Sequence, residues 1–300
     1  MTRKKSPAAP AKTTIRRPRP EEKSAPSLSR PKPSRPATER RFRLTIEYDG
    51  TQYSGWQIQA DAKSIQGSLA KAAATLFPEH KVEIQGCGRT DAGVHALHYV
   101  AHLSAATELA PQAIQYGLND ALPKDIVILA VERAGQDFHA RHSCVGRSYL
   151  YRIAKRKSAF EKKYVWWVRD RLNVGAMERA TRLMVGMHDF AAFAEKQELK
   201  KSTKVLLHQV ALAEEGDFLL IRVVGSHFLW KMVRRMVGIL VEVGRGRLTE
   251  EDVRQMLTGK SELPARHTAP PSGLFFERAF YSEKELQEFL AETSGEDEAG

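Results

Sequence analysis

A glycine-rich stretch at residues 86–95 (GCGRTDAGVH) constrains the fold of this chain more than any other segment. The residues before it, 81–85, alternate apolar and polar as a half-buried strand does, and residues 94–103 are apolar enough for a second strand. Glycines between two strands permit positive φ angles and a close approach to the backbone. The pattern predicts a turn that carries Asp91, in the kind of loop where chemistry is often placed.

Arg89 and Asp91 are the charged residues of this turn. An arginine near a carboxylate favours the ionised form of the acid, and its forked guanidinium can also grip a phosphate. An ionised aspartate beside such a grip suits catalysis on a nucleotide. Chemistry alone favours a plainer alternative, in which the aspartate accepts backbone N–H bonds and the arginine is a surface partner.

Residues 86–96 (GCGRTDAGVHA) resemble the signature of the tRNA pseudouridine synthase A family. Other segments resemble that family's further blocks in the same order, and together they cover residues 42–282. These segments are LTIEYDGTQYSGWQ (44–57), DFHARHS (137–143), SYLYRI (148–153), GMHDFAAF (186–193), FLWKMVRRMVG (228–238) and SGLFFERAFY (272–281).

The resemblance implies an isomerase that converts uridine to pseudouridine in the anticodon stem-loop of tRNA, at positions 38, 39 and 40. The C1′–N1 bond breaks and the base is rejoined through C5. This reaction is redox-neutral and implies no cofactor, and the chain has neither a GxGxxG motif after a strand nor a GxxxxGK[ST] motif. The resemblance also implies a cytoplasmic homodimer with an α+β fold of two similar mixed halves, a largely antiparallel sheet and a central active-site cleft.

The resemblance assigns roles to four residues. Asp91 is the catalytic residue, which either acts at the ribose C1′ or abstracts the 2′ proton. Arg89 holds the flipped nucleotide, Tyr149 stacks on the extruded uracil, and Arg234 keeps Asp91 ionised and placed. The base must leave its stack, because C1′ and C5 are out of reach inside a stem. From the residues alone, Tyr149 also fits an apolar core stripe, and Arg234 also fits a salt bridge at a helix end.

Four parts of the chain are expected: composition marks a tail at residues 1–40 and an acidic end at 286–300, and the resemblance implies two halves at 41–147 and 148–285. The first part holds 12 Lys and Arg, 3 Glu and 8 of the 14 prolines. It has too little apolar surface to offset its chain entropy, so it is predicted to be a disordered basic tail. It accounts for +9 of the net charge of +11, and the folded body is therefore nearly neutral. The tail could attract RNA phosphates, have no required role, or target an organelle. The last part is predicted to be an acidic tail.

Periodicity and turn signals predict the elements of the body. The segments expected are strands over 42–48, 126–131, 148–154, 204–213, 218–224 and 273–281, and helices over 64–77, 111–122, 173–186 and 228–243, with a last helix from Thr249 to Leu257. This order is that of an α+β protein.

Other patterns leave alternatives open. His95, His98 and His102 invite a metal site, but no further ligand lies at a suitable spacing, so no metal is expected. Basic and aromatic residues alternate over 155–171, which suits an RNA-facing surface or a solvated connection. Two cysteines are too few for a disulfide framework, which fits a cytoplasmic protein. No apolar run of about 18 residues predicts a membrane span.

Two other classes of protein compete with the isomerase. The first is a noncatalytic RNA-binding protein on the same fold, for which the basic tail would be the main binder. The second is a glycoside hydrolase, which needs a second carboxylate placed to act as an acid. Besides Asp91, only Asp49 is expected in a comparable glycine-built loop, and its role as a turn residue explains it better.

Overall fold

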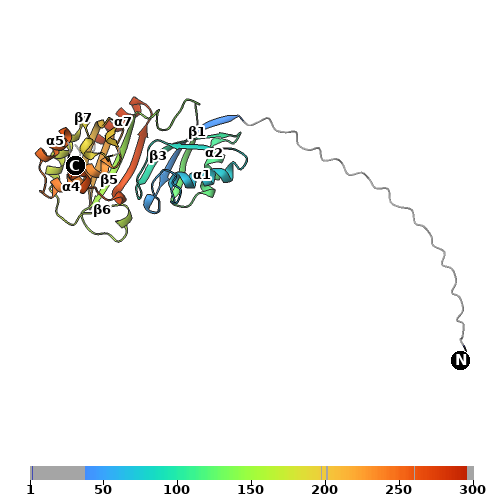
Figure 1. Cartoon of the computed structure of the whole chain (residues 1–300), viewed down its shortest axis with the longest axis horizontal. Helices are drawn as coiled ribbons and strands as arrows, with labels where there is room; N and C mark the ends of the chain where they lie inside the picture. Colours follow the sequence, from blue (N-terminus) through green and yellow to red (C-terminus); the bar gives the residue numbers. More distant parts are fainter. Residues whose placement is uncertain (1, 3–37, 197, 201, 260, 296–300) are drawn as a thin grey trace. The chain divides into compact units, whose positions relative to one another are not determined.

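The computed structural model describes residues 2, 38–196, 198–200, 202–259 and 261–295 (Figure 1). The strands are β1 (Glu39–Tyr48), β2 (Glu83–Gly86), β3 (His95–Ala106), β4 (Ile126–Ala134), β5 (Gly146–Ala154), β6 (Trp166–Trp167), β7 (Gly186–Asp189), β8 (Lys204–Glu215), β9 (Phe218–Gly225) and β10 (Leu274–Phe280). The helices are α1 (Ile65–Leu76), α2 (Pro111–Ala121), α3 (Val174–Met184), α4 (Met232–Gly244), α5 (Glu250–Thr258), α6 (Leu263–Arg266) and α7 (Glu283–Gly295).

The strands join one sheet in the order β4-β1-β3-β10-β5-β9-β8-β7, with β2 on β3 and β6 on β5. All pairings are antiparallel except β10 with β3 and β6 with β5. The α+β fold with a largely antiparallel sheet is therefore confirmed. The predicted division of the body at residue 148 falls inside β5.

β10 lies between β3 and β5, although it follows every other strand in the chain. Phe276 is opposite Ala96 of β3 on one side and opposite Tyr149 of β5 on the other. Phe276 is fully buried, which is expected of a central strand covered on both faces. This strand brings Tyr149 next to the part of β3 that leaves the Asp91 turn.

Most predicted elements are confirmed, together with the residues that begin them. Ser64 accepts a hydrogen bond from the Gly67 N–H at the start of α1, and Asn173 accepts one from Ala176 at the start of α3. Thr249 and Asp252 form a reciprocal capping box at the start of α5. Short polar side chains satisfy the free N–H groups of a first helical turn, so these starts could be read from the sequence.

α4 is the most buried helix of the described chain. All of its residues except Arg234 are buried, and its apolar side chains contact the core on every side. A helix that is apolar all round belongs in an interior. At Gly238 the backbone of α4 approaches the carbonyl oxygen of His267 so closely that a Cβ would lie 1.5 Å from it. α1 and α2 lie at the end of the sheet that carries β1, whereas α4 and α5 lie at the end that carries β7 (Figure 1).

Three sequence boundaries need correction. The basic tail was expected to reach residue 40, but Glu39 and Arg40 pair with Ala106 and Ala105 in β1. The acidic tail was expected from residue 286, but α7 extends to Gly295 because Leu286 and Phe289 are buried against the sheet. The helix expected from residue 228 begins at Met232. The predicted disorder of residues 1–37 and the acidic end, 296–300, lie outside the described residues, apart from Thr2.

No helix in the described part of the chain has the length and apolar content needed to span a bilayer.

Candidate active site

The residues that precede Asp91 in its turn are held by the body of the protein. Cys87 donates its N–H to the Val100 carbonyl at 2.9 Å, and Trp56 donates its N–H to the Thr90 carbonyl at 3.2 Å. The hydroxyl groups of Thr90 and Tyr48 are 2.9 Å apart. These contacts fix the backbone immediately before Asp91, so its side chain projects from an anchored loop.

The glycines of the turn have different uses. Gly93 has φ of +77°, as the sequence predicts for a tight turn. At Gly86 an added Cβ would lie 2.1 Å from the Tyr99 hydroxyl and 2.6 Å from the Trp56 ring. Gly86 thus makes room for two packed aromatic rings, rather than for a ligand.

Both carboxylate oxygens of Asp91 accept hydrogen bonds from the segment that begins α4. Arg234 Nη1 lies 3.0 Å from Oδ2, and Trp230 Nε1 donates to Oδ1 at 2.8 Å. The Asp91 side chain is 19% exposed, so it is held and still accessible. A bond between ionised groups is stronger than a neutral one. The predicted contact between Asp91 and Arg234 is present, and Trp230 is an additional partner.

Arg234 is itself held in place. Its Nε donates to the Ala269 carbonyl at 2.8 Å, and its own carbonyl accepts the Ala269 N–H at 3.0 Å. The side chain is only 14% exposed. Arg234 therefore presents one fixed edge of its guanidinium to Asp91.

Glu195 anchors the start of α4. Its Oε1 lies 2.8 Å from Lys231 Nζ and 2.9 Å from Arg235 Nη2. The hydrogen bond from Lys231, together with the charge of Arg235, lowers the pKa of Glu195. Lys231 has φ of +62°, a left-handed conformation that non-glycine residues rarely adopt. This turn at Lys231 sets Trp230 just before the helix and Arg234 within its first turn.

Arg147 ties the Asp91 turn to the segment before α4. It donates from Nη2 to the Cys87 carbonyl at 2.9 Å and from Nη1 to the Ser226 carbonyl at 3.1 Å. A third hydrogen bond reaches the carbonyl of Arg141. The Arg147 guanidinium therefore hydrogen-bonds both the segment that supplies Asp91 and the segment that supplies its partners.

Tyr149 lies on β5 among aromatic rings. It is 8% exposed and makes edge contacts with Phe228 and Phe276, whose centroids are 5.0 and 5.2 Å away. Burial, and next the neighbouring Cys87, raises the pKa of Tyr149. Its phenol is protonated at neutral pH, so it can act as a ring surface or an O–H donor. Its expected stacking on a base stays a prediction.

Arg89 is not the cation that holds Asp91. It is exposed, and no hydrogen bond or ion pair joins it to another described residue. Neighbours in sequence on a tight turn point in different directions, whereas α4 brings Arg234 directly to the carboxylate. Arg89 remains available for a ligand.

Two of the three histidines that suggested a metal site, His95 and His102, have other partners. His95 Nδ1 accepts the Gly50 N–H and His102 Nδ1 accepts the Ala140 N–H, both at 3.1 Å. Burial lowers the pKa of both rings. No group of three or more His, Cys, Asp or Glu side chains in the described residues is arranged to hold a metal ion.

Trp230 and Arg147 were not identified from the sequence as parts of the site. Trp230 precedes Arg234 by four positions, which is about one helical turn. This spacing could have suggested that the two side chains point to the same side of the predicted helix. Arg147 precedes the predicted strand by one residue, and no sequence signal marks it.

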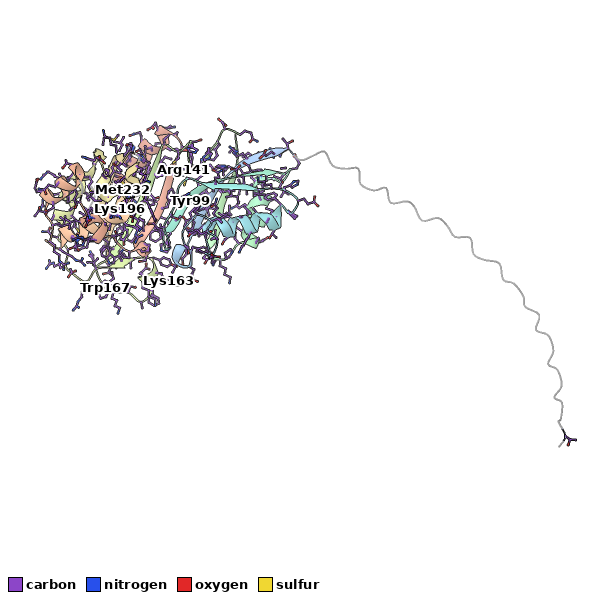
Figure 2. The ribbon with its side chains drawn as sticks, viewed as in Figure 1. Tyr99, Arg141, Lys163, Trp167, Lys196 and Met232 are labelled. Atoms are coloured by element: carbon purple, nitrogen blue, oxygen red, sulfur yellow. The ribbon has the colours of Figure 1, made fainter. Side chains whose placement is uncertain are left out.

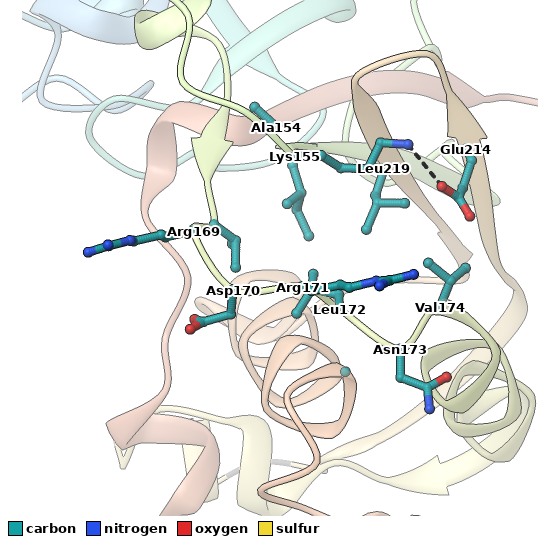
Figure 3. Close-up of a pocket in the computed structure, with 13 residues that line it drawn as sticks. Ala154, Lys155, Arg169, Asp170, Arg171, Leu172, Asn173, Val174, Glu214 and Leu219 are labelled. Carbon is teal, nitrogen blue, oxygen red and sulfur yellow. Dashed lines mark hydrogen bonds and ion pairs between the residues drawn. The ribbon is translucent and has the colours of Figure 1, made fainter.

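A cavity of about 780 Å³ lies away from Asp91, beside the end of β5 and the start of α3. Arg171 lies along it, whereas Arg169 points away, and Lys155 and Glu214 pair at its rim (Figure 3). Neither Asp91, Tyr149 nor Arg234 lines it.

The sequence matches known proteins over most of its length. The profile of a family described as tRNA pseudouridine synthase matches residues 44–143 and 180–282. The tRNA pseudouridine synthase A 2 of Clostridium tetani is 39% identical over 247 residues, which cover 81% of this chain and 99% of that protein. The tRNA pseudouridine synthase A of Rhodospirillum centenum is 41% identical over 244 residues, covering 80% and 99%. That of Exiguobacterium sibiricum is 37% identical and covers 81% and 98%.

The matched regions include the Asp91 turn, the segment that begins α4 and the strand β10 that joins the two sides of the sheet. With its fold, its held aspartate and these relatives, the chain belongs to the tRNA pseudouridine synthase family.

Proposed function

We propose that this isomerase acts on uridines 38, 39 and 40 of the tRNA anticodon stem-loop, with Asp91 as its essential catalytic residue. The single observation that carries the assignment of Asp91 is its position: a partly exposed carboxylate with hydrogen bonds to Arg234 and Trp230. A carboxylate held in one orientation is suited to attack or to accept a proton at a fixed point.

The reaction moves one bond of the base. The C1′–N1 bond breaks, the uracil turns, and C5 bonds to C1′, while C5 loses one proton and N1 gains one. Asp91 serves either by adding to C1′ as the base leaves or by removing the 2′ proton. In both routes the carboxylate must be ionised, and the ion pair with Arg234 at 3.0 Å holds it in place.

The other residues act on the nucleotide around this step. Tyr149 offers a ring to the extruded uracil at the edge of the Phe228 and Phe276 pair. Arg89, exposed and free of partners among the described residues, holds the flipped nucleotide through its phosphate or by filling the vacated stack. RNA contacts to the backbone and to unstacked bases supply the binding.

Replacement of Asp91 by asparagine tests this function. Asp91→Asn keeps the size of the side chain and removes its charge, so we expect pseudouridine formation to fall by at least about a thousandfold. Binding of an unmodified anticodon stem-loop should change by less than about threefold. Single-turnover assays and titrations with the same RNA measure both quantities.

The wild type is the control for these assays. Turnover by Asp91→Asn at the normal rate would remove the catalytic role of Asp91. Tight binding by the wild type with no base isomerisation would favour the noncatalytic RNA-binding protein instead.

The cytoplasmic location, the homodimer and the division into halves at residues 41–147 and 148–285 are also proposals. Their support is the family resemblance, together with the position of β10 between strands of the two halves. Light scattering of the purified full chain tests the dimer, because a mass equal to that of a single chain, 33.7 kDa, would contradict it.

A further inference from the structure

A second pocket lies beside the Asp91 turn. It has a volume of about 410 Å³ and is lined by Thr51, Gly93, Lys162, Lys163, Pro271 and Ser272. Gly93 belongs to the turn, and two residues of chain span at most about 7 Å between the Cα atoms of Asp91 and Gly93. Asp91 itself does not line the pocket, so a group bound there lies beside the turn that carries Asp91.

The backbone that carries the two lysines is fixed against the turn. Lys162 and Lys163 belong to the 3-10 turn η2 (Glu161–Lys163). His95 accepts the Gly50 N–H through Nδ1, so its Nε2 carries the proton and donates to the Lys163 carbonyl at 3.1 Å. Next along the chain, Tyr164 donates its hydroxyl to Asp49 Oδ2 at 3.0 Å. The ammonium groups thus extend from an anchored base.

Both ammonium groups are available for a ligand. Lys162 and Lys163 are exposed, and no ion pair joins either of them to another described residue. The nearby carboxylates have other partners: Glu161 pairs with Arg152 at 3.2 Å, and Asp49 accepts from Thr51 and Tyr164. Figure 2 labels Lys163 and Trp167 on the same edge of the molecule. Just before the lysines, Phe160 is 90% exposed.

We propose that Lys162 and Lys163 form a subsite for a phosphodiester of the RNA, within about two nucleotides of the uridine that is isomerised. Two unpaired ammonium groups beside a pocket suit a phosphate oxygen, and an exposed aromatic residue beside them suits an RNA base. Phosphate contacts of this kind set the register of a nucleic acid on a protein. The subsite rests on the proposed function and adds a way to place the target uridine over Asp91.

The double variant Lys162→Gln/Lys163→Gln tests the subsite in the full chain. With an unmodified anticodon stem-loop at about 0.1 M salt, we expect KM to rise by about tenfold or more, while kcat changes by less than about threefold. The slope of log KM against log salt should become shallower by about 1, because the variant no longer neutralises this one phosphodiester. Both side chains are exposed, so the thermal unfolding midpoint should not move.

A matched variant removes the same charge elsewhere. Lys71 and Lys124 are also exposed, and no ion pair joins either to another described residue. Lys71→Gln/Lys124→Gln should keep the KM and salt slope of the wild type. If the two double variants behave alike, the subsite is wrong. If the wild type itself forms no pseudouridine, the proposed function fails, and this outcome is distinct because it does not depend on either lysine.

Neutral linkages in the RNA locate the contact. A methylphosphonate placed at each linkage in turn should weaken binding to the wild type at one or two positions near the target uridine, and should cost nothing further in the Lys162→Gln/Lys163→Gln variant. The assignment would be overturned if the effect of a methylphosphonate depended on the two lysines only at distant linkages, or at no linkage. Competition by inorganic phosphate alone at millimolar concentration, with no linkage coupled, would identify a free-phosphate site instead.

Discussion

At the scale of single residues, the candidate catalytic carboxylate is notable for having no free oxygen. Arg234 and Trp230 each bind one oxygen of Asp91, but the two donors differ in freedom. Arg234 is fixed to the Ala269 carbonyl, whereas Trp230 is 43% exposed. Each oxygen keeps a further lone pair, so the carboxylate can react while both donors hold its orientation.

Trp230 variants separate the indole N–H from the ring. A hydrogen bond to a charged group is worth roughly 1.5–3 kcal/mol, so we expect Trp230→Phe to lower kcat by about ten- to a hundredfold with little change in KM. Trp230→His keeps a ring N–H donor and should retain kcat within about fivefold. Steady-state kinetics of pseudouridine formation measure both variants.

The half-exposed position of Trp230 makes loss of folding a poor explanation, and equal unfolding midpoints of the two variants would check this. Wild-type kcat in Trp230→Phe would show that the hydrogen bond to Asp91 has no part in the reaction.

The residues of the site were only partly predictable. Asp91, Tyr149 and Arg234 lie in segments with recognisable patterns, and the contact between Asp91 and Arg234 was among those expected. The contribution of Trp230 was not, because it depends on the left-handed turn at Lys231, which no glycine or asparagine marks. Arg147 was missed for a similar reason: its partners are backbone carbonyls, which every sequence contains.

At the scale of elements, α4 determines how the site is assembled. Its first turn presents Arg234 to Asp91, and its middle packs against the chain that follows α6. The residue that allows this packing is Gly238, which has the His267 carbonyl in the place of a side chain. Two residues later, Ala269 binds Arg234, so the packing at Gly238 and the direction of Arg234 are connected.

The variant Gly238→Ala tests this connection. The added Cβ would lie 1.5 Å from the His267 oxygen, so the backbone must shift, and we expect a loss of unfolding free energy of about 2–3 kcal/mol. Activity should fall as well, because Ala269 would move with His267. Urea unfolding and kcat are the two measurements.

Gly175→Ala in α3 is the matched control. Its Cβ would have nothing closer than about 3.7 Å, so the helix should keep or gain up to about 1 kcal/mol. Equal stability of the two variants would show that α4 can move away from the His267 carbonyl without the expected loss of unfolding free energy.

The elements themselves were largely predictable from periodicity and capping residues, since both are local. The partners of β10 were not. An apolar strand near the end of the chain pairs equally well, by its own pattern, with any exposed edge, and only the assembled sheet decides that it lies between β3 and β5.

At the scale of the whole molecule, buried histidines couple folding to pH. His102 on β3 is 1% exposed. Burial, and next the neighbouring His139 and Arg41, lowers the pKa of His102 to about 4, while Glu83 acts in the opposite direction. An unfolded chain has the ordinary value near 6.5 and binds more protons between these limits. The contribution of His102 to the free energy of unfolding is therefore complete above about pH 6.5 and is lost as the pH falls towards 4.

The size of this effect can be predicted from the difference in pKa. A shift of about 2.5 units corresponds to roughly 3 kcal/mol at the acid end of the window. His102→Gln removes the titrating ring, so its urea midpoint should fall less steeply than that of the wild type between pH 6.5 and 4.5. His80→Gln, at an exposed position, should keep the wild-type slope. Identical slopes for all three proteins would exclude His102 as a source of acid sensitivity.

The placement of β10 has a consequence for synthesis on the ribosome. A nascent chain has exposed Asp91, Arg234 and both neighbouring strands long before residues 274–280 leave the exit tunnel. Until then, β3 and β5 have no strand between them, and Phe276 cannot pair with Ala96 on one side and with Tyr149 on the other. The sheet around Asp91 is therefore completed only after residues 274–280 have left the tunnel.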